Sequence, residues 1–259
     1  MKHLWINIDK NLKRKNFMEK QFNNSKIDNI RISAITPEMF DDVLEHKRPL
    51  SCKHPGCTSC EYEFACLSSH IKAMRECLKY EDEYFVIMED DIYIPFKIDY
   101  DELLKNINKD IDIIQMMVLY DNTVKNLDIH HNITLTNFIK WQYLLPSTGM
   151  YIISKKGAKK LVDMFFNKNN KYDFSSSQYQ IVADVLLYSS VNTICSTLPY
   201  CYPYIEMGSE IHPDHLEAHL KAINEIKKVI TNKKNYPFIK KKFKRSEEHT
   251  SELQSPCNL

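Results

Sequence analysis

The chain has little glycine, no long apolar run and almost no net charge. None of its four glycines completes the Gly-rich loop of a P-loop nucleotide-binding protein. No window approaches the ~18 consecutive apolar residues of a transmembrane helix. The apolar stretch near the N-terminus is interrupted by Asn7 and Asp9 and is too short for a signal peptide. Because a net charge of +1 provides no general attraction to nucleic acid, we expect no nucleic-acid partner and no transmembrane segment, with a cytoplasmic location as the default.

The rest of the composition is that of a globular domain. Hydrophobic residues make up 43% and charged residues 27% of the 259 residues, which suffice to bury a core without disulfides. The eight cysteines are therefore expected to be thiols or metal ligands. Residues 245–255 read RSEEHTSELQS, a string that also arises when a common sequencing adapter is translated. We expect one domain over residues 1–244 and a non-native tail over residues 245–259, with a genuine polar tail as the alternative.

Segments with the patterns of strands and helices alternate along the chain. Short apolar runs predict strands, and apolar residues at steps of three and four predict helices. The alternation predicts an α/β fold with a mainly parallel central sheet. Residues 132–145 show no regular pattern. The predicted strands cover residues 3–8, 29–34, 84–88, 111–120, 149–153 and 192–198, and the predicted helices cover residues 12–22, 62–78, 101–108, 155–166, 178–188 and 216–230.

Three consecutive acids, Glu89, Asp90 and Asp91, directly follow the apolar run 84–88. Ligands of open α/β sheets bind beyond the carboxyl ends of the strands. Carboxylates at such a position can hold Mn²⁺ or Mg²⁺, which bind carboxylate oxygens and bridge phosphate oxygens. Because alternate residues of a strand share a face, we expect Glu89 and Asp91 to be the metal ligands, with Asp90 opposite. The alternative is a solvated strand end without a metal.

Four motifs in order give the sequence a resemblance to glycosyltransferase family 25, the group of lipooligosaccharide and collagen galactosyltransferases. Ile6-Asn7-Ile8-Asp9 with Arg14 is similar to the family's opening I-N-L-D…R. Glu63 to His70 resembles its E-x-G-C-x-x-S-H, although Ala65 replaces the usual glycine. Val86 to Asp91 resembles its apolar strand ending in E-D-D, and Gly149 to Leu161 its G-x-x-Y-x-x-S-x-x-G-A-x-x-L. Looser matches follow at Asp184 with Leu186 and at Pro203 with Ser209.

The resemblance implies a GT-A-like nucleotide-sugar-binding fold and a metal-dependent transferase. It further implies a UDP-hexose donor, often UDP-galactose, a Mn²⁺ cofactor, and inversion at the anomeric carbon. The acceptor is then a glycan or a hydroxylated protein side chain. Inversion needs a general base that deprotonates the acceptor hydroxyl as it attacks. We expect Asp184 to be that base, with Glu206 as the second candidate; both residues have the alternative of a purely structural role.

The same resemblance nominates a set of donor-binding residues. Asn7 lies at the end of the first predicted strand and Asp9 and Arg14 follow it, where a nucleotide would lie, and the Arg14 guanidinium offers a planar fork to phosphate. Ser69 and His70 lie on a predicted helix beside the donor site, and Asp90 belongs to the acidic cluster. For His70, a hydrogen-bonded helix residue without a ligand is the competing interpretation. Cys66 and Cys77 are expected to pack as small apolar residues.

Three further features leave alternatives open. Cys52, His54, Cys57 and Cys60 are enough soft ligands for a structural zinc site, but a loop of free thiols is favoured. His212, His215 and His219 offer a metal ligand near the site, against an exposed first helix turn, which is favoured. The basic residues 233–244 favour a solvated helix end over a peripheral contact with anionic lipid or a polyanionic acceptor.

Two rival functions remain at this point. A metal-dependent phosphotransferase or nuclease could use the same acids, but no P-loop supports it. A catalytically silent sugar- or protein-binding module, with the cysteine-rich loop as its interaction element, is the alternative from another class. Turnover of a nucleotide-sugar distinguishes the transferase from the binding module.

Overall fold

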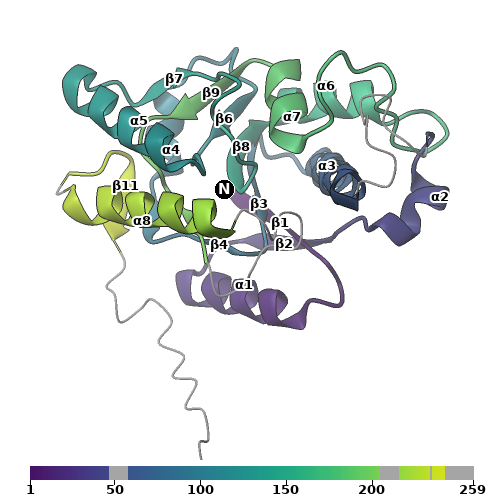
Figure 1. Cartoon of the computed structure of the whole chain (residues 1–259), viewed down its shortest axis with the longest axis horizontal. Coiled ribbons are helices and arrows are strands. Elements are labelled where there is room, and N and C mark those ends of the chain that lie inside the picture. Colours follow the sequence, from purple (N-terminus) through teal and green to yellow (C-terminus); the bar gives the residue numbers. More distant parts are fainter. Residues whose placement is uncertain (47–57, 205–215, 234, 243–259) are drawn as a thin grey trace, which may run out of the picture.

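A seven-stranded sheet forms the centre of the protein (Figure 1). The computed structural model describes residues 1–46, 58–204, 216–233 and 235–242. In spatial order, the strands are β2 (Asn29–Ser33), β1 (Lys2–Asn7), β3 (Tyr84–Glu89), β8 (Met150–Ser154), β6 (Ile113–Gln115), β9 (Thr193–Ser196) and β7 (Phe138–Lys140).

The sheet is mixed. Strands β2, β1 and β3 are parallel, β8 runs antiparallel to both β3 and β6, β6 and β9 are parallel, and β7 is antiparallel to β9. Five of the seven strands thus share one direction. The predicted α/β class is confirmed, with β8 and β7 as the two reversed strands.

Helices cover both faces of this sheet (Figure 1). One face packs against α3 (Thr58–Cys77), α6 (Lys155–Phe165) and α7 (Ala183–Ser190), with the short η1 (Pro37–Met39) and α2 (Phe40–Val43) beside them. The other face packs against α1 (Leu12–Ser25), α4 (Tyr100–Lys105), α5 (Asp121–Thr134) and α8 (Leu216–Asn232).

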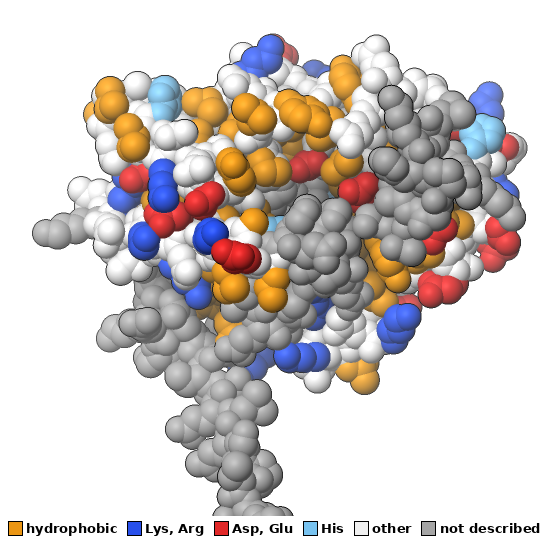
Figure 2. Space-filling model, viewed as in Figure 1, with side chains coloured by type: hydrophobic (Ala, Val, Ile, Leu, Met, Phe, Trp, Pro, Cys, Tyr) orange, Lys and Arg blue, Asp and Glu red, His pale blue; other side chains and the backbone are white. Residues whose placement is uncertain are grey.

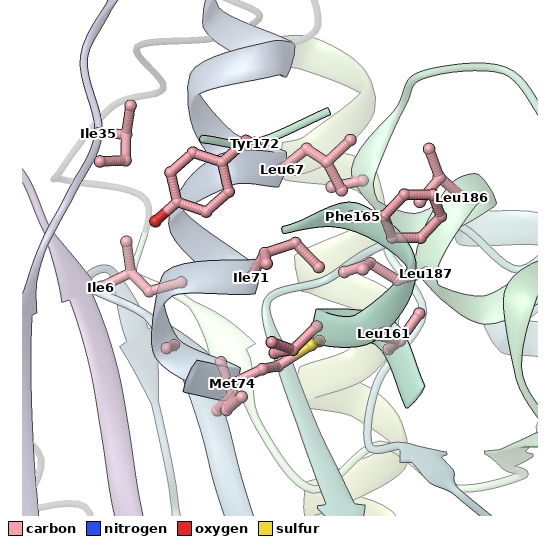
Figure 3. Packing of buried hydrophobic residues seen from close by; sticks show 14 of the residues in the cluster. Ile6, Ile35, Leu67, Ile71, Met74, Leu161, Phe165, Tyr172, Leu186 and Leu187 are labelled. Carbon is pink, nitrogen blue, oxygen red and sulfur yellow. The ribbon is translucent and has the colours of Figure 1, made fainter. Parts of the chain in front are cut away.

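Alternate residues of the central strands belong to the two hydrophobic cores, one on each face of the sheet. In β3, Phe85 and Ile87 belong to the core under α3, whereas Val86 and Met88 belong to the core under α1 and α8. Figure 3 shows the first of these cores, where Ile71 and Met74 of α3 lie near Leu161 of α6. A strand buried on both faces has an uninterrupted apolar run, which is why residues 84–88 are apolar throughout.

Most predicted elements are present, with shifted ends. Of the predicted strand 111–120, only Ile113–Gln115 forms a strand, and Met116, Met117 and Val118 follow it as buried backbone outside the strand. The predicted helix 178–188 begins only at Ala183.

One helix was missed, and the expectation for the basic end was wrong. The helix α5 buries only Val124 and Leu127, and no side chain caps its N-terminus, so its sequence has little amphipathic signal. Within the basic segment, β11 (Ile239–Lys242) pairs with β5 (Phe96–Ile98) instead of extending a solvated helix. A second small ladder joins β4 (Ile92–Tyr93) to β10 (Tyr202–Pro203).

Several predictions lie outside the described residues: those for Glu206, His212, His215, the tail 245–259, and the loop residues Cys52, His54 and Cys57. Cys60 belongs to the first turn of α3. Among the described helices, none is both long and apolar enough to cross a membrane.

Candidate active site

Three cavities meet at the carboxyl end of β3, in the middle of the sheet. Their volumes are about 170 Å³, 570 Å³ and 80 Å³. Glu89 lines all three, and Asp91 lines the first and the third. The first cavity lies over the ends of β1 and β2 against α3, and the second lies between α7, α8 and the loop before β8. The last residue of β3 therefore lies where two larger spaces adjoin.

Asp90 is held by β1 and α1. One of its carboxylate oxygens accepts a hydrogen bond from Nδ2 of Asn7 at 2.7 Å, and the other pairs with Nη1 of Arg14 at 2.6 Å. Asp90 and Arg14 are both buried, and burial raises the pKa of Asp90 although Arg14 and Asn7 oppose that rise. Because both oxygens are taken by protein partners, Asp90 joins the first strand and first helix to β3.

Asp91 keeps a carboxylate oxygen available. Its Oδ2 lies 3.4 Å from Nη2 of Arg14, while its Oδ1 is buried and has no hydrogen-bond partner among the residues that the structure describes. Burial raises the pKa of Asp91 to about 7; Arg14 opposes the rise, and the charges of Glu89 and Asp90 add to it. A buried carboxylate with a free oxygen beside other acids is a position that a cation would stabilise.

Glu89 is held from the other side. Its Oε1 accepts a hydrogen bond from the Thr148 hydroxyl at 2.8 Å, and Nε2 of His70 lies 3.7 Å from the same oxygen. Although burial opposes ionisation, His70, Thr148 and Arg14 together hold the pKa of Glu89 below its ordinary value. Glu89 is therefore a carboxylate at neutral pH, and its side chain is 31% exposed to the cavities.

The helix α3 forms one wall of the first cavity. Ser69 and His70 line this cavity and are themselves buried. The Ser69 hydroxyl donates to the carbonyl of Ala65 at 2.7 Å and accepts from the backbone N–H of Ile35 at 2.8 Å, which fastens the chain after β2 to α3. Arg14 and Lys10 also line this cavity, so that it brings basic groups close to the acidic cluster.

The loop before β8 lines the second cavity and is held by several hydrogen bonds. Asp184 accepts a hydrogen bond from the backbone N–H of Ser147 at 3.0 Å, and the carbonyl of Ser147 accepts from Tyr188 and Gln115, each at 3.0 Å. Ser147 has φ 123°, a conformation that residues other than glycine rarely adopt. These bonds fix the loop that carries Thr148 to Glu89.

The structure brings some of the sequence-predicted site residues to the cavities and leaves others away from them. Arg14, Ser69 and His70 line the first cavity with the three acids, and Asp184 lines the second. Asn7 lies beneath the cluster, where it donates to Asp90 and accepts from Arg31 at 2.8 Å. Asp9 lies apart: its carboxylate pairs with Arg31 and accepts from Ser33, which lowers its pKa, and it lines none of the three cavities.

Comparison with known proteins identifies the family. The sequence matches the model of glycosyltransferase family 25, described as an LPS biosynthesis protein, over residues 1–176. The chain belongs to glycosyltransferase family 25. Its α/β fold has a mixed central sheet with the acidic cluster at the carboxyl end of β3, which agrees with the α/β class predicted from the sequence. A comparison of this family 25 chain with curated proteins gave no match.

Solved structures resemble this glycosyltransferase only distantly. A197 from STIV is 14% identical, with a TM-score of 0.43 and coverage of 83% of this chain and 91% of that chain. A glycosyltransferase involved in glycosylation of the major capsid of PBCV-1 is 13% identical, with a TM-score of 0.34 and coverage of 64% and 66%. HddC from Yersinia pseudotuberculosis, complexed with GMP-PN, is 14% identical, with a TM-score of 0.36 and coverage of 86% and 98%. Resemblances this distant do not identify a substrate.

Sequence reasoning missed two residues of the site. Thr148 had no signal, because its contact with Glu89 depends on the antiparallel pairing of β3 with β8. Cys66 packs against the core under α3, as expected, but it is only half-buried and also lines both larger cavities. Its spacing of four residues from His70 places both on one helix face, and that spacing was a usable signal.

Proposed function

We propose that this family 25 glycosyltransferase moves a hexose from a UDP-sugar, with galactose as the first candidate, onto a glycan or a hydroxylated protein side chain with inversion. The observation that carries the proposal is the position of Glu89 at the junction of all three cavities. A transferase needs adjoining sites for donor and acceptor with charged groups at their boundary. The first cavity, with Arg14 and Lys10, suits an anionic donor, and the larger second cavity suits the acceptor.

Glu89 and Asp91 are the proposed ligands of Mn²⁺ or Mg²⁺. The residues fit such an ion, because Asp91 has a buried oxygen without a hydrogen bond among the described residues and Glu89 is ionised with 31% of its side chain exposed. When bound, the cation would neutralise the negative charge that develops on the departing diphosphate. Arg14 holds Asp90 and Asp91 in place and adds a second positive group at the same end of the cavity.

Asp184 is the proposed general base. Its carboxylate lines the second cavity and is oriented by the backbone N–H groups of Ser147 and Val185. Burial raises its pKa above the ordinary value, although these hydrogen bonds oppose the rise. A base whose pKa is raised toward the working pH accepts a proton more readily from an attacking hydroxyl. Glu206 stays the second candidate and lies outside the described residues.

A ligand panel tests the proposal. The purified chain is heated with a series of nucleotides and nucleotide-sugars, with and without Mn²⁺, and release of the nucleotide is measured in parallel. A ligand that binds only the folded state raises the midpoint temperature of unfolding. At a concentration a hundred times its Kd, it stabilises the folded state by about 2.7 kcal/mol. We expect a Mn²⁺-dependent rise for UDP and one UDP-hexose, together with slow hydrolysis of that sugar.

Two results would contradict the proposal in different ways. Binding of a UDP-sugar without hydrolysis or transfer would favour the silent binding module. No change with any nucleotide, in a sample that unfolds cooperatively, would remove the donor assignment altogether.

A further inference from the structure

Cys66, His70 and Glu89 form a compact set of possible metal ligands on the wall between the two larger cavities. Cys66 and His70 are four residues apart in α3, so that their side chains leave the same face of the helix. The Sγ of Cys66, a ring nitrogen of His70 and a carboxylate oxygen of Glu89 all lie within 4.8 Å of one another. Two ligands of one tetrahedral zinc ion lie roughly 3.5 Å apart, given metal–ligand distances of about 2.0–2.3 Å. The 3.7 Å between Nε2 of His70 and Oε1 of Glu89 is close to that spacing.

The environment of the His70 imidazole suits a metal ligand. The side chain is fully buried, and its Nε2 has no hydrogen-bond partner among the described residues. Its Nδ1 lies 3.0 Å from the hydroxyl of Tyr151 in β8. When Nδ1 carries the proton and donates it to that hydroxyl, Nε2 presents its lone pair toward Glu89 and Cys66. A histidine that binds a metal almost always has such a bond at its other nitrogen.

The surroundings of the thiol favour a cation. Burial raises the pKa of the Cys66 thiol, and the negative charges of Glu89, Asp184, Glu63 and Asp91 add to that rise. The guanidinium of Arg14, which lines the first cavity together with Cys66, is engaged with Asp90 and Asp91. A positive ion between Cys66, His70 and Glu89 would therefore be attracted by several carboxylates at once.

We propose that Cys66, His70 and Glu89 bind a borderline-soft divalent cation of the Zn²⁺ class. A thiolate, an imidazole and a carboxylate form a donor set that suits Zn²⁺ better than Mg²⁺ or Mn²⁺, which take oxygen ligands. Three protein ligands leave a fourth position, and Cys66 and Glu89 both line the two cavities into which it can open. Because Glu89 is also a proposed ligand of the donor's cation, occupancy by Zn²⁺ competes with binding of Mn²⁺ at that residue.

Cobalt provides a probe that reports on the thiol directly. Co²⁺ replaces Zn²⁺ in tetrahedral sites, and a cobalt–thiolate bond has an intense charge-transfer absorption that oxygen and nitrogen ligands do not produce. The full chain is titrated with Co²⁺ alone, without nucleotide. A background variant in which Cys52, Cys57 and Cys60 are serine removes the other thiols with metal-ligand spacing. Cys66→Ser and His70→Gln are then compared in that background, with Cys77→Ser, a buried thiol of the same helix that lines none of the three cavities, as the matched control.

We expect one equivalent of Co²⁺ to produce the thiolate band in the background variant and in the Cys77→Ser control. Cys66→Ser abolishes the band, and His70→Gln raises the Kd for Co²⁺ by about tenfold or more. Zn²⁺ but not Mn²⁺ displaces the bound cobalt.

Absence of the band in the background variant, or its persistence after Cys66→Ser, overturns the proposal. Circular dichroism checks that each variant is folded, and if Cys66→Ser is not, the background variant and His70→Gln decide. The readout needs no nucleotide or turnover, so failure of the transferase proposal leaves it intact.

Discussion

The three acids at the end of β3 are adjacent in sequence, yet each has a different environment. Glu89 is bonded to Thr148 and faces three cavities, whereas Asp90 is buried with both oxygens taken by Asn7 and Arg14. Asp91 lies between these extremes, with one oxygen near Arg14 and one buried oxygen without a hydrogen bond among the described residues. At the scale of residues, this division assigns a structural task to Asp90 and leaves its two neighbours for a ligand.

Replacing Asp91 by asparagine is expected to change both activity and the pH dependence of stability. Loss of a group that stabilises charge at the reacting centre costs on the order of 10²–10³-fold in turnover. The pKa of Asp91 is raised from 3.8 to about 7 in the folded protein. The folded state therefore keeps a proton that the unfolded state releases, and the metal-free wild type loses stability as the pH rises through this window.

The Asp91→Asn variant lacks that loss, so its stability relative to wild type should increase between pH 4.5 and pH 7, within the window set by the two pKa values. Urea denaturation without metal at the two pH values measures the difference, and UDP-sugar hydrolysis measures turnover. Asp163→Asn, at an exposed carboxylate of α6, is the matched control and should leave both unchanged. An Asp91→Asn variant with the same relative stability at both pH values would contradict the assigned pKa.

At the scale of elements, two close contacts fix helices to the sheet. Arg14 of α1 reaches across to the carboxylate of Asp90 at the end of β3, and both groups are buried. Gly157 in the first turn of α6 lies against the backbone of Asp112, so closely that a Cβ would meet Asp112 Cβ at 2.8 Å and its carbonyl oxygen at 2.9 Å. Neither Arg14 nor Gly157 is needed for its own helix to form, but each is needed for the contact of that helix with the sheet.

Replacing Arg14 by methionine should leave the Asp90 carboxylate buried without its charged partner. Removing one partner of a buried ion pair costs about 3–5 kcal/mol of stability. The double variant Arg14→Met/Asp90→Asn should recover part of that loss, because it no longer buries a lone charge. Urea denaturation measures the stability of the single and the double variant, with Lys20→Met at an exposed position of α1 as the control. A double variant no more stable than Arg14→Met would show that the ion pair is not the source of the loss.

Replacing Gly157 by alanine tests the approach of α6 to the sheet. Helix propensity alone predicts a gain of about 1 kcal/mol. The contact with the backbone of Asp112 predicts a loss of about 1–3 kcal/mol, because the helix must shift away from a rigid neighbour. We expect the loss to prevail in thermal denaturation. Lys156→Ala, at the exposed position before it, should change stability by no more than a few tenths of a kcal/mol.

At the scale of the whole molecule, the chain after α8 returns to the core. Tyr236 is 7% exposed and packs against Phe96 and Tyr200, and its hydroxyl donates to the carbonyl of Pro199. The strand β11 then pairs with β5, and Phe238 stacks on Phe138. These contacts join the C-terminal segment to parts of the chain that are distant in sequence, so residues 235–242 belong to the packed domain.

Two truncations test this boundary. A chain that ends after Lys233 loses Tyr236 and β11 and should lose at least about 3 kcal/mol of stability, the typical cost of removing a large buried side chain. A chain that ends after Lys244 should unfold at the same midpoint as the full chain, as the predicted domain boundary requires. Thermal denaturation compares the two truncations with the full chain. A stable chain ending at Lys233 would contradict the packing described here, and a destabilised chain ending at Lys244 would contradict the boundary.

The sequence by itself determined the α/β class and the candidate metal ligands, because both depend on local order. A strand covered on both faces needs an unbroken apolar run, and acids directly after it must lie at its carboxyl end. The ordered motifs also determined the family, which the match over residues 1–176 confirmed.

Only the tertiary structure decided which of these residues meet. Asp9 lies two residues after the end of β1 but pairs with Arg31, because the parallel register of β1 with β2 brings that guanidinium close. Thr148 reaches Glu89 only because β8 runs antiparallel to β3, and Cys66 reaches it only because α3 packs over the end of that strand. Such contacts depend on strand direction and helix packing, which local sequence patterns do not encode. The basic segment that forms β11 had no local signal for a strand, because its partner β5 lies far away in the chain.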